Sequence, residues 1–292
     1  MTLARAPDYN WCMQRFFLPL FFAPLALFAA DEQISAFHTE IERLAPAFDQ
    51  IIPRDARIEK LAEGFNWSEG PTWFKGSVVF SDVPENIIYQ WKPGATKAAI
   101  FLKPSGMLTP HEGFREQGSN GLAVDADGRL LICQHGERRV ARLNPDNSQS
   151  ALADKFEGKR FSSPNDLALR KNGDIYFTDP PYGLDKLNAS PLKEIAWNGV
   201  YRISRDGTVS LLVKDLSFPN GIAFSPDEKI LYVAVSDAAK PHIMAYEVQS
   251  DGSVAKGRVF FDATPLQSAK RKGSCDGLKV DAKGNLFATG PG

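Results

Sequence analysis

A five-fold repeat constrains this chain more than any other feature, and the first position of every copy carries a carboxylate or a carboxamide. The five copies are Glu69-Gly-Pro-Thr-Trp73, Asn120-Gly-Leu-Ala-Val-Asp125, Asn165-Asp-Leu-Ala-Leu169, Asn220-Gly-Ile-Ala-Phe224 and Asp276-Gly-Leu-Lys-Val-Asp281. Their first residues are 51, 45, 55 and 56 residues apart. This period matches one four-stranded blade of a β-propeller and disfavours a solenoid of helices.

Each copy opens a stretch that is typical of β structure. A short apolar run leads into a tight turn, such as Lys171-Asn-Gly173, and a β-rich run follows, such as Ile230-Leu-Tyr-Val-Ala-Val235 in the next unit. Apolar runs separated by Asn, Asp and Gly predict β-hairpins. Further strand pairs follow in the same units, for example 199–203 with 209–213. Four strands per unit are what a blade requires, so we predict an all-β propeller.

The polar first positions should meet near the propeller axis, because the innermost strand of every blade begins there. Buried together without a partner, the carboxylates would repel and the amide carbonyls would lack donors. A divalent cation resolves both problems. Asn-Gly and Asp-Gly pairs also start hairpins, which is the alternative interpretation. A separate Asp, Asn or Gly turn already serves each hairpin, however, so the cation site is favoured.

Composition agrees with a turn-rich β domain. Hydrophobic residues make up 43% of the chain, and 23 Gly and 20 Pro supply turns. The formal net charge is −1 and becomes −2 if a leader containing Arg5, Asp8 and Arg15 is removed. The sequence has no basic stripe with interleaved aromatic residues, which argues against a nucleic-acid partner.

Residues 1–30 have the form of a secretory signal peptide. Arg15 precedes the apolar run 16–28, which contains two prolines and is too short to span a bilayer. The position three residues before the expected cleavage point is not small, so an uncleaved anchor is the alternative. We expect cleavage, a periplasmic or secreted protein and no stable membrane anchor. Residues 31–57 should form a helical segment, because apolar positions in 34–44 have helical spacing.

Only two cysteines lie beyond this leader, Cys133 and Cys275, and they fall in different units of the repeat. This arrangement does not support a disulfide framework. We predict two buried free thiols on or beside inner strands.

Several motifs taken in order resemble the gluconolactonase, regucalcin (senescence marker protein) and LRE-like family over roughly residues 58–292. They are Ser68-Glu-Gly-Pro-Thr-Trp73, Ser163-Pro-Asn-Asp-Leu167, Tyr176-Phe-Thr-Asp-Pro-Pro-Tyr-Gly183, Phe218-Pro-Asn-Gly-Ile222 and Cys275-Asp-Gly-Leu278. The resemblance implies a six-bladed β-propeller over 58–292. A sixth repeat would fall about 52 residues beyond Asp276, so we expect an incomplete final blade.

The same resemblance implies a divalent ion, commonly calcium, held by Glu69, Asn165, Asn220 and Asp276. It places Asn120 against the substrate or a metal-bound water. Hard oxygen donors without His or Cys independently favour Ca²⁺, leave Mg²⁺ and Mn²⁺ open, and make Zn²⁺ the least favoured ion. As further substrate-binding candidates at the channel mouth we take His135 and Tyr182, for which ordinary hydrogen-bonded loop roles are the alternative.

These expectations point to a hydrolase that opens a sugar lactone, with the metal polarising the carbonyl and Asp276 as general base. Glu69 is the competing base. The sequence has no Gly-x-Ser-x-Gly elbow and its four histidines form no motif, which disfavours a nucleophilic serine or cysteine. Two alternatives stay open: a phosphotriesterase-like hydrolase, and a propeller that binds a sugar or a partner without turnover.

Overall fold

The computed structural model describes residues 40–267 and 273–290, and these residues divide between Lys60 and Leu61 into two compact units. The signal peptide expected over 1–30 and residues 34–39 of the expected helix lie outside the described residues. In the first unit, residues 40–44 are not helical, and a 3₁₀ helix η1 (Pro46–Gln50) follows them. Its proline in the first turn suits a helix start, where no backbone donor is needed. Across the described ranges, no helix has the length and apolar character required to cross a membrane.

The second unit contains four antiparallel sheets of four strands each, and every sheet keeps its strands in chain order. The sixteen strands, sheet by sheet, are β1 (Ser68–Phe74), β2 (Ser77–Asp82), β3 (Ile87–Trp91) and β4 (Ala99–Leu102); β5 (Ser119–Val124), β6 (Leu130–Gln134), β7 (Arg139–Leu143) and β8 (Gln149–Ala153); β11 (Leu167–Leu169), β12 (Ile175–Asp179), β13 (Asn198–Ile203) and β14 (Val209–Leu216); β15 (Pro219–Phe224), β16 (Ile230–Val235), β17 (His242–Glu247) and β18 (Arg258–Asp262). Smaller elements complete it: β9 (Lys155–Phe156), β10 (Lys159–Arg160), η2 (Leu187–Ala189), η3 (Thr264–Leu266), β19 (Leu278–Val280) and β20 (Leu286–Ala288).

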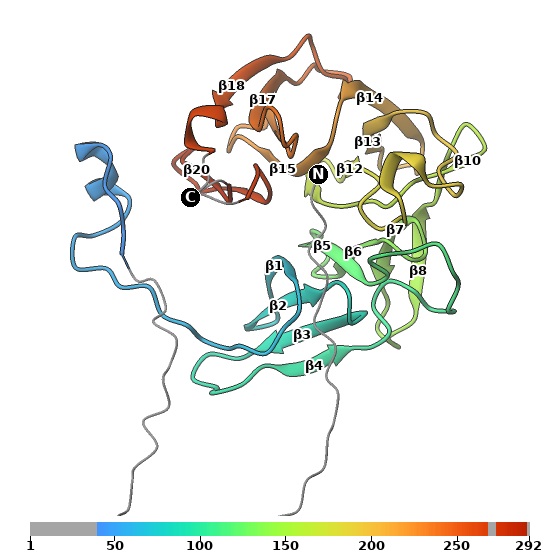
Figure 1. The fold of residues 1–292 in the computed structure, drawn as a ribbon, viewed down its shortest axis with the longest axis horizontal. Helices are drawn as coiled ribbons and strands as arrows, with labels where there is room; N and C mark the ends of the chain where they lie inside the picture. The colour runs from blue at the N-terminus through green and yellow to red at the C-terminus, as the bar shows by residue number, and fades with distance from the viewer. Residues whose placement is uncertain (1–39, 268–272, 291–292) are drawn as a thin grey trace, which may run out of the picture. The chain divides into compact units, whose positions relative to one another are not determined.

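The first strand of each sheet is its innermost strand. Strand β1 contacts β5, β5 contacts β11, β11 contacts β15, and β15 contacts β19. In Figure 1 the sheets follow one another along an arc from β1 to β20, with these first strands toward the middle. The arrangement is therefore an all-β, propeller-like fold with four four-stranded blades. The predicted run 230–235 coincides with β16 and the predicted run 199–203 lies within β13, which confirms the hairpin interpretation there.

The core lies between neighbouring sheets. One cluster joins β5–β8 to β11–β14 and includes an aromatic group in which the Phe161 ring lies 5.0 Å from Phe177 and 5.1 Å from Tyr201. Cys133 belongs to this cluster, and Cys275 is buried beside β19. Both thiols are free, as predicted. Packing each sheet against the next fixes where the inner strands begin, which is where the repeated polar residues lie.

Candidate metal and substrate site

The five repeated polar residues all lie at the beginnings of inner strands. Glu69, Asn120 and Asn220 are within β1, β5 and β15, whereas Asn165 and Asp276 lie two residues before β11 and β19. In β1, β5 and β15 the pairing register shifts by a β-bulge at this point. A bulge leaves residues unpaired and redirects their side chains. The bulge thus leaves Asn120 and Asn220 out of the ladder pairing, whereas Glu69, at the edge of its bulge, still pairs with Ser81.

The glycine that follows three of these residues is required by a close backbone approach. A Cβ atom at that glycine would collide with the carbonyl oxygen of the next repeat. The distances would be 2.4 Å from Gly70 to Asn120, 2.6 Å from Gly121 to Asn165 and 2.2 Å from Gly221 to Asp276. Such contacts are far shorter than real Cβ contacts. The Glu-Gly and Asn-Gly pairs therefore let neighbouring blades meet near the centre.

Hydroxyl groups from second strands reinforce this junction. Ser81 Oγ in β2 donates to the backbone oxygen of Asn120 at 2.8 Å, and Thr178 Oγ1 in β12 donates to that of Asn220 at 2.8 Å. Each bond links one sheet to the first strand of the next. The polar side chains consequently sit on a backbone that is fixed from both sides.

A cavity of about 490 Å³ opens where these strands begin, and all five repeated polar residues line it. Its remaining lining is Trp67, Ser68, Gly70, Pro71, Asp166, Gly277, Leu278, Lys279, Phe287, Ala288 and Thr289. Ligand-binding clefts commonly have volumes of about 300–1,000 Å³. The cavity is therefore large enough for a small organic molecule beside an ion.

The two repeat carboxylates share this poorly solvated space. Burial, together with repulsion from Asp276 and Asp166, raises the pKa of Glu69 to about 8, although the Trp67 indole donates to Glu69 Oε1 at 2.7 Å. Burial and the nearby Asp166 also raise the pKa of Asp276, against a hydrogen bond from Asn220. A cation close to two carboxylates with raised pKa values would stabilise their charged form. The donor set therefore fits a divalent ion.

Three buried amides complete the oxygen donors. Asn120, Asn165 and Asn220 are 5%, 3% and 8% exposed. Asn220 Nδ2 donates to Ser236 Oγ at 3.0 Å, and the same amide is a donor to the Asp276 carboxyl group. Within 40–267 and 273–290, no group of three or more His, Cys, Asp or Glu side chains is arranged to hold a metal. A site here thus depends on amide oxygens, as hard-cation sites often do.

Asp166 is a further cavity residue that sequence reasoning missed. It takes the place that glycine holds in four of the five repeats. Its Oδ1 accepts from Leu167 N at 2.9 Å, its Oδ2 accepts from Ile222 N at 3.3 Å, and Lys279 Nζ lies 4.0 Å from Oδ2. The break in the repeat was the signal that could have found it. Asp166 joins two inner strands and adds negative charge to the cavity.

Asp179 is a second missed residue, which supports the loop carrying Asn165. It is fully buried, and its two oxygens accept from Ser162 N and Ser163 N at 2.8 Å each. The backbone N–H of Asn165 donates to Thr178 O at 2.9 Å. These hydrogen bonds hold the 162–165 loop against the end of β12. No local pattern identifies such a role, because the partners are 16 and 17 residues apart.

The structure places the last two candidates beside the cavity lining rather than in it. His135 is fully buried, neither ring nitrogen has a hydrogen-bond partner among the described residues, and Glu116 Oε2 lies 3.7 Å from Nδ1. Burial and the Arg115 charge lower the pKa of His135 to about 3, so the ring is neutral. The Tyr182 ring stacks on Phe218 with centroids 5.8 Å apart. A substrate-binding role for either residue stays a prediction.

Fold and site together define a β-propeller protein with an oxygen-rich cavity where its inner strands begin. The chain belongs to the SMP-30/Gluconolactonase/LRE-like family, which matches residues 67–292. It is 43% identical over 265 residues to a gluconolactonase of Zymomonas mobilis subsp. mobilis, covering 87% of this chain and 72% of that protein. A lactonase, drp35, of Staphylococcus aureus is 30% identical over 174 residues, covering 57% of this chain and 48% of that protein.

Solved structures agree with this assignment. A gluconolactonase of Xanthomonas campestris superimposes with a TM-score of 0.69 at 32% identity, covering 84% of this chain and 77% of that one. A calcium-binding protein, regucalcin, of Agrobacterium tumefaciens gives a TM-score of 0.57 at 20% identity, covering 77% and 68%. The second likeness bears on the fold alone. The resemblance inferred from the motifs is thereby confirmed at the level of the family.

Proposed function

We propose that this chain is a metal-dependent lactonase that opens a sugar lactone by adding water to its carbonyl carbon. One observation carries the proposal: two carboxylates and three buried amides from five repeats line a single cavity. A cavity that only bound a neutral sugar would not need two carboxylates that repel each other. Relatives named gluconolactonase and lactonase support the substrate class.

The proposed ion ligands are Glu69, Asn165, Asn220 and Asp276. Their two carboxylates balance a dication, and the oxygen-only donor set favours Ca²⁺ over Zn²⁺, with Mg²⁺ and Mn²⁺ between. When bound, a divalent cation supplies Lewis acidity that polarises a carbonyl and stabilises negative charge on its oxygen.

Asp276 is the proposed general base. Its carboxylate takes a proton from water as the water oxygen bonds to the carbonyl carbon, and it returns that proton to the ring oxygen when the ring C–O bond breaks. Burial and the Asp166 charge raise the pKa of Asp276 in the protein without an ion. A bound dication would oppose this shift and keep the carboxylate ionised, as a general base must be. Asn120 would orient the substrate through its amide, and His135 and Tyr182 remain candidates for the outer wall.

An assay of purified full chain tests the proposal. Hydrolysis of a panel of aldonolactones should require Ca²⁺ and stop on chelation, while an organophosphate such as paraoxon should be turned over more slowly. Faster organophosphate hydrolysis would favour the phosphotriesterase alternative. Binding of lactone without hydrolysis under any metal would favour a non-catalytic propeller.

We also propose that the blades belong to a six-bladed ring and that the protein is exported. The spacing of the repeats and the family supply the first idea, and the signal-like residues 1–30 supply the second. Detection of the mature protein in a periplasmic or secreted fraction, with its N-terminus sequenced, tests the export.

A further inference from the structure

A second cavity, of about 650 Å³, lies at the opposite ends of two of these inner strands, β5 and β11. Asn120 lies near the start of β5 and lines the first cavity, whereas Val124 ends this strand and lines the second. Four residues of strand separate these two positions by about 13 Å. The two cavities have no lining residue in common. The second cavity is thus a separate site.

The floor of this second cavity is apolar. Leu131, Ile175 and Ile203 are buried side chains of the core between sheets β5–β8 and β11–β14, and Leu152 and Leu169 pack against them. Leu152 and Leu169 are partly exposed, so a ligand with a hydrocarbon or aromatic body could cover them and remove them from water. Burial of each methylene group favours binding.

The rim of the cavity is charged, with more cations than anions. Five cationic and three anionic side chains line it, which gives a formal charge of +2. They are Arg129, Arg142, Arg170, Lys171 and Arg205 against Asp125, Asp127 and Glu228. The whole chain has a formal charge of −1, so this excess of positive charge is local.

Two of the arginines already use the available carboxylates. Arg129 Nε lies 2.7 Å from Asp125 Oδ2, and its Nη2 also pairs with Asp127. Arg170 Nε lies 3.4 Å from Glu228 Oε2. All three rim carboxylates are therefore engaged.

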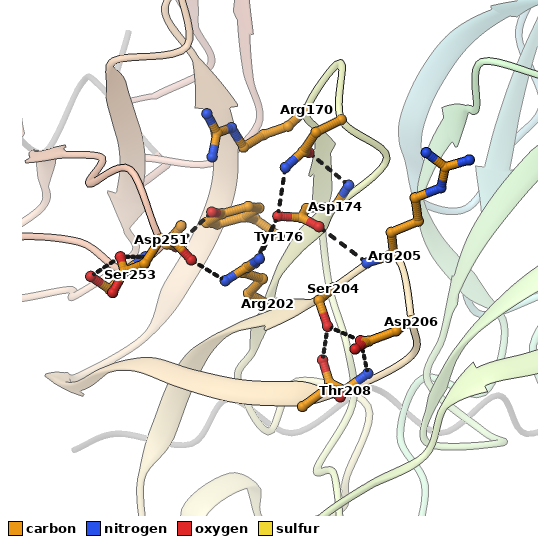
Figure 2. A network of polar contacts seen from close by, with 12 residues as sticks. Arg170, Asp174, Tyr176, Arg202, Ser204, Arg205, Asp206, Thr208, Asp251 and Ser253 are labelled. Carbon is orange, nitrogen blue, oxygen red and sulfur yellow. Dashed lines mark hydrogen bonds and ion pairs between the residues drawn. The ribbon is translucent and has the colours of Figure 1, made fainter.

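Arg142 and Arg205 have no ion pair with any described carboxylate. Arg142 is half-buried in β7, opposite Leu131. The backbone of Arg205 is fixed, because its N–H donates to Asp174 Oδ1 at 3.1 Å while Arg202 holds Asp174 Oδ2 at 2.8 Å. Figure 2 shows the Arg205 side chain extending away from this network. Two guanidinium groups are thus left to an outside partner.

We propose that the second cavity binds an amphiphilic organic anion, with a carboxylate, sulfonate or phosphate group at Arg142 and Arg205 and an apolar body on the apolar floor at Leu152 and Leu169. Guanidinium groups bind such oxyanions through paired, charge-assisted hydrogen bonds. A free sugar acid would not use the apolar floor, and a neutral lipid would not use the arginines. The cavity therefore favours a molecule that carries both an anionic group and an apolar body.

Calorimetric titration of the full chain with hexanoate, octanoate and decanoate tests this site. Affinity should rise about threefold to fourfold for each methylene group added. Octanol, which lacks the charge, should bind at least tenfold more weakly than octanoate. Arg142→Ala and Arg205→Ala should each weaken octanoate binding about tenfold or more.

Arg258→Ala is the matched control, because Arg258 is an exposed strand arginine outside both cavities. It should leave octanoate affinity unchanged, and Asn220→Ala, which alters only the first cavity, should do the same. Equal affinity for octanol and octanoate, unchanged binding by Arg205→Ala, or loss of binding in Asn220→Ala would each overturn the proposal. Arg205 is exposed, so its variant decides the matter even if Arg142→Ala fails to fold.

Discussion

At the scale of single residues, the candidate site concentrates carboxylates that burial makes costly to ionise. Glu69, Asp166 and Asp276 line one cavity, and the pKa values of Glu69 and Asp276 are both raised. Backbone N–H groups donate to both oxygens of Asp166, whereas Glu69 and Asp276 each have one side-chain donor, Trp67 and Asn220. Hydrogen bonding therefore sets Asp166 apart and leaves Asp276, the proposed base, and Glu69 as the candidates for proton transfer.

We predict that Asp276→Asn lowers lactone turnover by about two to four orders of magnitude. The amide keeps an oxygen that can coordinate an ion but cannot accept a proton near neutral pH. Steady-state kinetics with metal content measured for each variant checks this. Asp281→Asn, at a half-buried hairpin turn outside the cavity, serves as the control. Near wild-type turnover by metal-replete Asp276→Asn would move the base to Glu69.

Asn120→Ala should raise KM for the lactone more than it lowers kcat. Asn120 is buried at the cavity and is not among the proposed ion ligands, so its amide is free to bind substrate. Loss of a contact that binds the substrate and the transition state equally raises KM and leaves kcat unchanged. A variant with unchanged KM and a large loss of kcat would instead give Asn120 a part in the chemistry.

Asp179 should make stability depend on pH in the mildly acidic range. Burial raises its pKa from 3.8 to about 6, against hydrogen bonds from Ser162 and Ser163. The folded state therefore holds a proton that the unfolded state has released, and the free energy of unfolding falls as pH rises from about 4 to about 6. The contribution is at most about 3 kcal/mol and is constant above pH 6.

Urea unfolding at several pH values gives the free energy of unfolding of wild type and of Asp179→Asn as a function of pH. The contribution of Asp179 is the difference between the slopes of these two curves against pH. Asparagine cannot titrate, so the variant should lack the decline. Parallel curves for the two proteins between pH 4 and pH 6 would contradict the assignment of a raised pKa to Asp179.

At the scale of strands and loops, the sequence was sufficient where the chemistry is local. Alternating apolar runs and Asn, Asp or Gly turns predicted hairpins, and the repeat period predicted blades, because both depend on neighbours in the chain. The roles of Asp166 and Asp179 were not predictable in this way, since Ile222 lies 56 residues from Asp166. The glycine that follows the polar residue is visible in the sequence. The reason for it, a close backbone contact with the next blade, is seen only in the three-dimensional structure.

Gly121→Ala should destabilise the junction between β5 and the Asn165 loop. A Cβ there would lie 2.6 Å from Asn165 O, which is backbone and cannot rotate away. Overpacking of this kind costs about 1–3 kcal/mol. Gly277→Ala is the matched control, because the equivalent Cβ in the Asp276 repeat meets only Thr289 Oγ1 at 3.6 Å. Equal unfolding free energies for the two variants would refute the close-approach argument.

At the scale of the whole molecule, an ion at the cavity would join residues from separate sheets. Glu69 belongs to the first sheet, Asn220 to the fourth, and Asp276 precedes the β19–β20 hairpin. These sheets contact one another mainly through their first strands. An ion coordinated by residues from several sheets would therefore add a direct link between them. A ligand at 100 times its dissociation constant stabilises the folded state by about 2.7 kcal/mol.

If calcium occupies this cavity as proposed, its removal should lower both activity and thermal stability. We predict that chelation lowers Tm by about 5–10 °C and abolishes lactone hydrolysis, and that added Ca²⁺ restores both. Glu69→Gln should reduce the calcium-dependent part of Tm, because it removes one of the two ligand charges, while Glu247→Gln, on exposed β17 surface, should not. Scanning calorimetry with and without chelator measures the shift. If exhaustive chelation changes neither Tm nor hydrolysis, no ion connects these strands. The charge of Glu69 is then neutralised by a bound proton and not by a cation.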